Sequence, residues 1–434
     1  MVGIDRVVAA LRKASGWSLL RRLVGYWWVV VPTIIVGALV VRGPLSLDLG
    51  ANIYISEDSA LFYYSGRQWV EAGRVPYRHL WDLKPPLIHE IGAVLALATG
   101  GDSVAMHALG VAVNTATLVS SILGLTLLVR RITDSQLAGF ATGTSFLAFP
   151  YLFGALTKGL QAKYPFALCL TLVLVMGFEE RWLEAAAAAA LAASLWQPGL
   201  LPVFLVLGTV EWYKRTGYLG VSASNRAGAA VLGVAALVVS PIVLGNAVPE
   251  MLVQAVAAPL ITADGGAGLQ TVLFQTHPML AIVGLVGATG FGVRSVHPVR
   301  WWPLILVVGF GLLAVWGDLD GVPDLIPLSI LLAFSTGLAV GVARPPRSRP
   351  MLSDARLWLV ILVVGAVALA DPPTFAAGEN ADVARLFLRG EIRPRCHIRY
   401  SSAERQMMGV ADTPINAFGR STVNQCWRPA WWPW

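Results

Sequence analysis

Charged and aromatic side chains are concentrated in one short stretch of the chain, between Glu57 and Lys84. A carboxylate there can accept a proton from a hydroxyl group, and a cation can bind a phosphate and stabilise the charge that develops as it leaves. Aromatic faces can stack on a sugar ring. These groups suit the transfer of a group from a lipid phosphate to a hydroxyl. The candidate residues in this stretch are Glu57, Asp58, Arg74, Tyr77, Arg78, Asp82 and Lys84.

The same residue types also occur at ordinary membrane interfaces, where Trp and Tyr form belts. On that interpretation, Arg67, Trp69 and His79 are anchors or loop packing. It explains any single residue of the stretch well, but it explains the spacing of the whole set less well.

The elements that must position these residues are membrane helices. The chain has 434 residues, of which 56% are hydrophobic and 13% charged, whereas about a quarter of the residues in a soluble domain are charged. Lipid must therefore be its solvent. A spanning helix needs about 20 mostly apolar residues. Eleven predicted spans are centred near residues 34, 117, 144, 170, 189, 205, 235, 286, 308, 333 and 363.

The loop charges predict the orientation of these spans. The connections at 196–199, 245–277 and 317–323 contain no Lys or Arg, whereas the alternate connections are basic. Because basic loops stay on the cytoplasmic side, we expect a cytoplasmic N-terminus and an extracellular C-terminus in the cell membrane. The predicted parts are a cytoplasmic amphipathic segment (1–24), a transmembrane catalytic domain (25–371) with the first outer loop at 43–102, and an external C-terminal cap (372–434).

Some outer segments do not fit simple spans. Residues 85–99 and 250–258 are predicted to form short helices along the outer surface, and the turn at 196–199 is predicted to join two helices tightly. The acidic turn that ends at Asp324 could touch a sugar or a cation, or could cap the tenth span. Gln161 and Gln197 could contact sugar hydroxyls. Cys396 and Cys426 could pair if the tail is outside the cell.

The spacing of the first outer loop resembles that of a known family. Asp58 is followed by Phe62, Gly73, Pro76-Tyr77 and Lys84-Pro85-Pro86-Leu87. This pattern is similar to that of the membrane glycosyltransferases with the C-type fold, which include protein O-mannosyltransferases, lipid A aminoarabinose transferases and archaeal enzymes that use dolichyl-phosphate mannose. The resemblance implies an all-α polytopic fold of about 11 spans with interfacial helices in the first outer loop.

The resemblance also implies an inverting transfer of a sugar, with mannose expected, from a dolichyl- or polyprenyl-phosphate donor to a hydroxyl. Asp58 would be the catalytic base and Lys84 would hold the lipid phosphate, with Lys158 and Lys163 completing the phosphate site. No metal or other cofactor is implied, and the six histidines show no metal spacing. One departure is Ser59, since many relatives have Glu there, and the second carboxylate of this chain, Glu57, lies on the other side of Asp58.

Alternatives from other functional classes remain open at this point. The acceptor could be a lipid-linked glycan, which we favour, or a protein hydroxyl. A polytopic transporter or lipid-linked-glycan flippase would show charges at mid-membrane and repeated halves, whereas the predicted helix centres are nearly free of charge and no repeat is visible. A noncatalytic glycan-binding subunit is the third alternative. No basic patch with interleaved aromatic residues indicates nucleic-acid binding.

Overall fold

A computed structural model describes residues 56–79, 82–257, 259, 268–316 and 322–343. All regular secondary structure in these ranges is helical, as the composition predicts. Several predicted elements lie outside the described residues. They are the segment 1–24, the first span near residue 34, the last span near residue 363, and the cap at 372–434 with Cys396 and Cys426.

The described helices include long apolar elements that suit a membrane. Three are long and apolar enough to cross it: α6 (Ser103–Thr133), α12 (Val221–Leu244) and the helix Pro323–Val342, which contains α18 (Ile326–Val342). A fourth candidate is a pair bent by 69°, Gln136–Ala148 with Tyr151–Lys158. The protein is therefore a multi-pass membrane protein. Within the described ranges, the predicted centres from residue 117 to residue 333 all lie in helices, although the number of spans stays a prediction.

The remaining helices are shorter. They are α7 (Gln136–Ser145), α8 (Tyr151–Gly154), α9 (Lys163–Phe178), α10 (Trp182–Leu195), α11 (Leu200–Arg215), α13 (Val248–Met251), α15 (Gly268–Gln275), α16 (Pro278–Arg294) and α17 (Trp302–Trp316). The predicted tight connection at 196–199 is confirmed, because η3 (Gln197–Gly199) joins α10 directly to α11. The predicted helix at 250–258 is confirmed as helical by α13 and the π-helix Leu252–Ala257.

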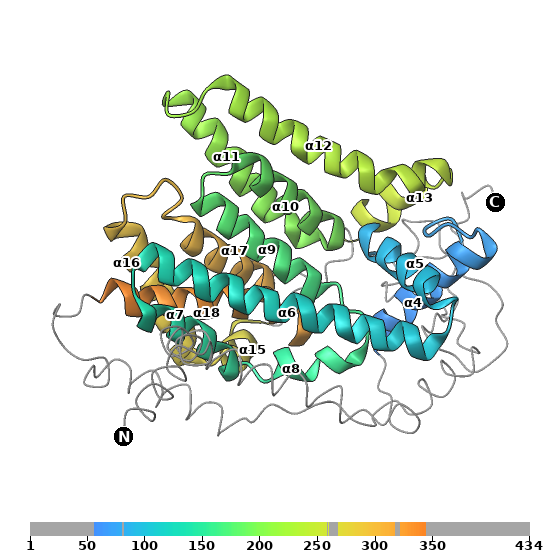
Figure 1. Cartoon of the computed structure of the whole chain (residues 1–434), viewed down its shortest axis with the longest axis horizontal. Coiled ribbons are helices and arrows are strands. Elements are labelled where there is room, and N and C mark those ends of the chain that lie inside the picture. Colours follow the sequence, from blue (N-terminus) through green and yellow to red (C-terminus); the bar gives the residue numbers. More distant parts are fainter. Residues whose placement is uncertain (1–55, 80–81, 258, 260–267, 317–321, 344–434) are drawn as a thin grey trace, which may run out of the picture.

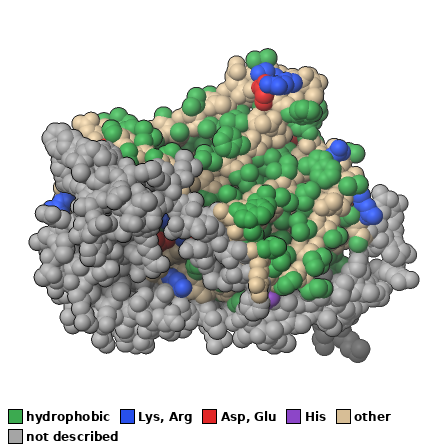
Figure 2. All heavy atoms as spheres, turned by 180° about the vertical axis from the view of Figure 1, so that it is seen from behind, with side chains coloured by type: hydrophobic (Ala, Val, Ile, Leu, Met, Phe, Trp, Pro, Cys, Tyr) green, Lys and Arg blue, Asp and Glu red, His purple; other side chains and the backbone are tan. Residues whose placement is uncertain are grey.

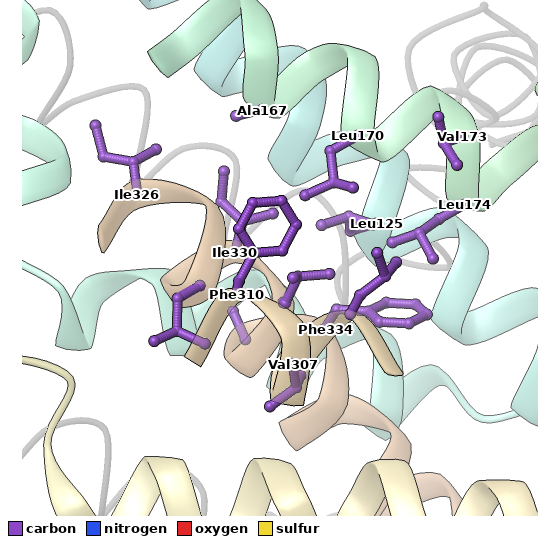
Figure 3. Close-up of a cluster of buried hydrophobic side chains, with 14 of the residues drawn as sticks. Leu125, Ala167, Leu170, Val173, Leu174, Val307, Phe310, Ile326, Ile330 and Phe334 are labelled. Atoms are coloured by element: carbon purple, nitrogen blue, oxygen red, sulfur yellow. The ribbon is translucent and has the colours of Figure 1, made fainter. Parts of the chain in front are cut away.

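The core forms where α6, α9, α17 and α18 converge. Leu125, Leu170, Phe310 and Phe334, one from each of these helices, point toward one another (Figure 3). Because lipid tails are as apolar as leucine, close packing rather than a hydrophobic effect must hold such helices together. Gly287 of α16 illustrates this, since a Cβ there would clash with the Ser335 carbonyl of α18.

The outer surface is largely apolar, as a lipid-facing surface must be. Figure 2 shows hydrophobic side chains spread over the described face, with only a few charged groups. On α12 only 17% of the apolar window is buried, and Leu232 and Leu237 are each 72% exposed. Such exposure would be unfavourable in water, so this helix belongs against lipid.

A helical hairpin, α4 (Glu57–Ala72) with α5 (Leu87–Thr99), lies at one end of the molecule beside α13 (Figure 1). Ser56 caps α4 by accepting a hydrogen bond from the backbone of Ser59, and Gly73 ends the helix in the left-handed region at φ 64°. The two helices touch at Gly66 and Gly92, where a Cβ on Gly66 would clash with the Gly92 backbone. The predicted helix at 85–99 is thus confirmed as α5, and its place along the membrane surface stays a prediction.

Candidate active site

A cluster of three charged side chains lies at the start of α4. The Lys163 ammonium lies 3.1 Å from Oδ2 of Asp58 and 3.2 Å from Oδ1 of Asp324. Lys163 is the first residue of α9, and Asp324 comes from η5 (Val322–Leu325), just before α18. The side chains are 7% exposed for Lys163, 14% for Asp324 and 39% for Asp58. Asp58 is therefore the member of the cluster that a substrate can reach most easily.

Ser59 shows why an acidic pair is missing here. Its side chain is fully buried, and its hydroxyl donates to the Leu160 carbonyl at 2.9 Å and accepts from the Gln161 amide at 2.7 Å. A glutamate at this position would place a carboxylate against a carbonyl in a buried site. Ser59 therefore joins α4 to the connection between α8 and α9, residues 155–162.

That loop is clamped to two other elements. Asn114 of α6 donates to the carbonyls of Leu156 and Gly159 and accepts from the backbone of Gln161. Gly159 has φ 91°, and a Cβ on it would clash with Ser59. These contacts hold the chain just before Lys163, so the ammonium is placed by buried backbone rather than by an exposed loop.

A second cluster holds the loop that carries Lys84. Oδ1 of Asp82 accepts from the Lys84 backbone at 3.1 Å, and the Tyr77 hydroxyl donates to the Lys84 carbonyl at 2.6 Å. Burial, together with the charges of Asp82 and Glu90, raises the pKa of Tyr77 well above its ordinary value. Tyr77 therefore stays protonated and remains a donor. Oδ2 of Asp82 lies 3.0 Å from Nε2 of the buried His89.

Gln254, in the π-helix after α13, ties this loop to the rest of the molecule. Its amide donates to the Tyr77 carbonyl at 2.6 Å and accepts from the Asp82 backbone at 3.0 Å, and its side chain is buried. Gln197 donates to the Leu83 carbonyl and to the Ala255 carbonyl. Gln197 therefore holds backbone, and a role in sugar contact stays a prediction.

The two clusters are connected through aromatic rings. Phe62 lies one helical turn after Asp58, and its ring packs edge-on against His89 at 5.8 Å between centroids. The Lys163 ammonium lies 5.9 Å from the ring centroid of Trp196, the residue before Gln197. Asp58 and the Lys84 loop are thus two sides of one packed assembly.

The other predicted site residues lie around this assembly. Arg74 is exposed and donates to Gln68, whereas Arg78 donates to the Gly245 carbonyl at 3.4 Å. Lys158 ends η2 (Leu156–Lys158), and its carbonyl accepts from the Ser56 backbone. The side chain of Glu57 lies outside the described residues. The structure thus brings Asp58 together with Lys163, and Tyr77 together with Asp82 and Lys84.

His89, Gln254 and Asp324 contact predicted site residues but are not themselves among them. Asp324 was considered as a helix cap, but the N-cap of α18 is Leu325, which makes no capping hydrogen bond, and the Asp324 carboxylate contacts Lys163 instead. The acidic turn was therefore the one available signal. No local pattern marks His89 or Gln254. Within the described ranges, no group of three or more His, Cys, Asp or Glu side chains could hold a metal ion.

The chain is similar in sequence to dolichol phosphate-mannose mannosyltransferases. Residues 73–238 match the family described as DolP-mannose mannosyltransferase. This range includes the Lys84 loop and Lys163, and it begins after Asp58. The chain is also 27% identical over 348 residues to the dolichol phosphate-mannose mannosyltransferase of Haloferax volcanii, covering 76% of this chain and 74% of that protein.

The fold also has a solved counterpart. The crystal structure of ArnT from Cupriavidus metallidurans bound to undecaprenyl phosphate superposes with a TM-score of 0.55 at 15% sequence identity, covering 87% of this chain and 69% of that one. At this identity the likeness concerns the fold. The two sequence similarities confirm the resemblance to membrane mannosyltransferases that residues 58–87 indicated, and the structural similarity confirms the fold that it implied.

Proposed function

We propose that this protein is an inverting glycosyltransferase that moves mannose from a dolichyl- or polyprenyl-phosphate donor to a hydroxyl acceptor on the outer face of the membrane. The observation that carries the proposal is the partly exposed Asp58 carboxylate, which Lys163 holds at the start of α4. One turn further along α4, Phe62 packs against His89, which lies beside Asp82 in the Lys84 loop. The similarity to dolichol phosphate-mannose mannosyltransferases supports the class of donor.

The reaction follows from the placement of these groups. Asp58 accepts the proton of the acceptor hydroxyl while that oxygen attacks the anomeric carbon. The bond from this carbon to the phosphate oxygen breaks, its electron pair stays on that oxygen, and polyprenyl phosphate leaves. Attack and departure occur on opposite faces of the sugar, so the configuration inverts. A positioned base contributes typically 10²–10⁴-fold to such a reaction.

Lys84 suits the phosphate better than Lys163 does. Among the described residues no carboxylate pairs with the half-buried Lys84 ammonium, whereas Lys163 is already between two carboxylates. The backbone on both sides of the Lys84 side chain is fixed, because its N–H and its carbonyl are both hydrogen-bonded. A fixed cation can stabilise the negative charge that grows on the leaving phosphate.

The proposed orientation places this site outside the cell. α6 starts at Ser103, beside the α4–α5 hairpin, and carries Arg130 and Arg131 in its last turn. A helix of 31 residues is about 45 Å long, so the basic residues lie far from the site. Basic residues favour the cytoplasmic side, which supports a cytoplasmic N-terminus and an outer site. A lipid-linked glycan is the preferred acceptor, and a protein hydroxyl is the alternative.

Purified protein in detergent with a polyprenyl-phosphate mannose donor and a lipid-linked glycan acceptor tests the proposal. We expect Asp58→Asn to reduce transfer at least about 100-fold and Lys84→Met to raise the KM for the donor. Glu71→Gln is the matched control, because Glu71 is an exposed carboxylate on the same helix. Full transfer by well-folded Asp58→Asn protein would refute the assignment of the base. In protein reconstituted into liposomes, movement of the lipid-linked glycan across the bilayer without a covalent product would favour the transporter alternative.

A further inference from the structure

The Asp58–Lys163–Asp324 cluster contains one carboxylate more than a simple ion pair needs. We infer that Asp324 is a positioning residue for the transfer reaction, which shares the Lys163 ammonium with Asp58 and thereby sets the orientation and basicity of Asp58. The inference rests on the proposed function, since it takes Asp58 to be the base.

Lys163 lies almost equally close to both carboxylates, at 3.1 Å from Asp58 and 3.2 Å from Asp324. The backbone next to Lys163 and the backbone next to Asp324 are both held in place by the surrounding structure. Lys163 follows the loop clamped by Asn114, and Asp324 precedes Leu325, which is 1% exposed in the helix core. The Lys163 side chain is itself buried, so it cannot leave the cluster for solvent. Two fixed anchors therefore define where the ammonium points, and through it where the Asp58 carboxylate points.

The charges explain what the second carboxylate does. An ammonium paired with Asp58 alone would neutralise it and make it a weak base, because an opposite charge within about 4–6 Å lowers a carboxyl pKa. Asp324 competes for the same ammonium and offsets part of its effect on Asp58. Asp58 thus keeps the contact that orients it, while Asp324 weakens the pull of the ammonium on it.

Other ionisable residues of the described part of the chain also lie near Asp58. Lys163 faces it from α9, Asp324 belongs to η5, and Lys158 of η2 is adjacent through the backbone bond to Ser56. Glu57 is the neighbouring ionisable residue on α4 itself. Neither Lys158 nor Glu57 is altered in the variants below, so changes in pH dependence report on the Lys163 and Asp324 charges.

The test is the pH dependence of kcat/KM in the transfer assay, measured for Asp324→Asn, Asp324→Glu and Lys163→Met. The acid limb of this profile, where kcat/KM falls as the pH is lowered, reports the protonation of Asp58. Loss of the Asp324 charge should stabilise the Asp58 anion, so the acid limb should move to lower pH by about one unit. Because Asp58 is then a weaker base, kcat/KM should also fall about 10-fold. Loss of the Lys163 charge should move the limb to higher pH by about one unit. Asp324→Glu keeps the negative charge, so its acid limb should lie closer to the wild-type pH than that of Asp324→Asn.

The outcomes separate this inference from the proposed function. A wild-type rate and profile for Asp324→Asn, with Asp58→Asn inactive, would overturn the inference and leave the proposed function standing. If Asp58→Asn is also fully active, the base assignment itself fails. A slower Asp324→Asn enzyme whose acid limb has not moved would show a merely structural role and would also overturn the inference. Glu71→Gln again serves as the control carboxylate.

Discussion

Replacing Gln254 with methionine should loosen the loop that carries Lys84 while leaving the Asp58 cluster intact. Gln254 makes two buried hydrogen bonds to this loop, to the Tyr77 carbonyl and from the Asp82 N–H. Methionine has a similar shape but can satisfy neither group. Each orphaned buried group costs about 1–3 kcal/mol. The half-buried Lys84 segment can admit some water, so we expect the variant to lose about 2–4 kcal/mol of folding free energy.

Only part of this cost should appear in catalysis, because Asp82 and Tyr77 still hold the Lys84 backbone. If about 1.4–2.8 kcal/mol of this cost is lost from transition-state stabilisation, kcat/KM falls 10- to 100-fold. A displaced ammonium should weaken donor binding, so much of the fall should be a higher KM for the donor. The acid limb of the pH profile should not move, because no charge near Asp58 changes.

The assay combines transfer kinetics at varied donor concentration with thermal unfolding in detergent. Gln270→Met is the matched control, since Gln270 is an exposed glutamine of α15. A Gln254→Met enzyme with wild-type donor KM and an unchanged unfolding temperature would refute the reasoning. An effect on the acid limb instead of on KM would also refute it, because it would place Gln254 in contact with the base rather than with the Lys84 loop.

Two further predictions concern the α4–α5 hairpin. Gly66→Ala should clearly lower the unfolding temperature, because its Cβ would clash with the Gly92 backbone. Gly228→Ala on α12 is the control, since open space surrounds Gly228 and the unfolding temperature should not fall. Equal effects of the two substitutions would contradict the close contact between α4 and α5. Burial raises the pKa of Glu90 to about 7, so Glu90 destabilises the fold increasingly as pH rises from about 4.5 to about 7. The folding free energy of Glu90→Gln relative to wild type should therefore improve by about 1–2 kcal/mol as the pH rises through this range, a value discounted for the half-exposed side chain. Unfolding measured at several pH values checks this, and an advantage of Glu90→Gln that grows as the pH falls would contradict the raised pKa.

The local patterns of the chain were sufficient to predict the described helices, and they singled out Asp58 and Lys84, whose roles stay predictions. Apolar runs predict helices because the backbone must satisfy its own hydrogen bonds in lipid, and the described predicted centres do lie in helices. The Pro85-Pro86 pair predicts a short helix after Lys84, which is α5. The spacing from Asp58 to Lys84 led to the resemblance that the sequence comparisons confirmed.

The local patterns were less informative about what surrounds those two residues. Lys163 stands at the edge of an apolar run and looks like a solvated lysine, yet it is buried between two carboxylates. Ser59 looks like a lost carboxylate, yet it joins α4 to the connection between α8 and α9. In both cases the deciding partner comes from another helix or loop, so no local window contains it.

The sequence by itself determined that this is a helical membrane protein, and it identified Asp58 and Lys84 as the pair to examine, because hydropathy and motif spacing are local properties of the chain. Only the tertiary structure decided that Asp324 shares Lys163 with Asp58 and that Gln254 holds the Lys84 loop. Those contacts join segments far apart in sequence. These contacts form because close helix packing at glycines and hydrogen bonds to buried amides fix the positions of the side chains.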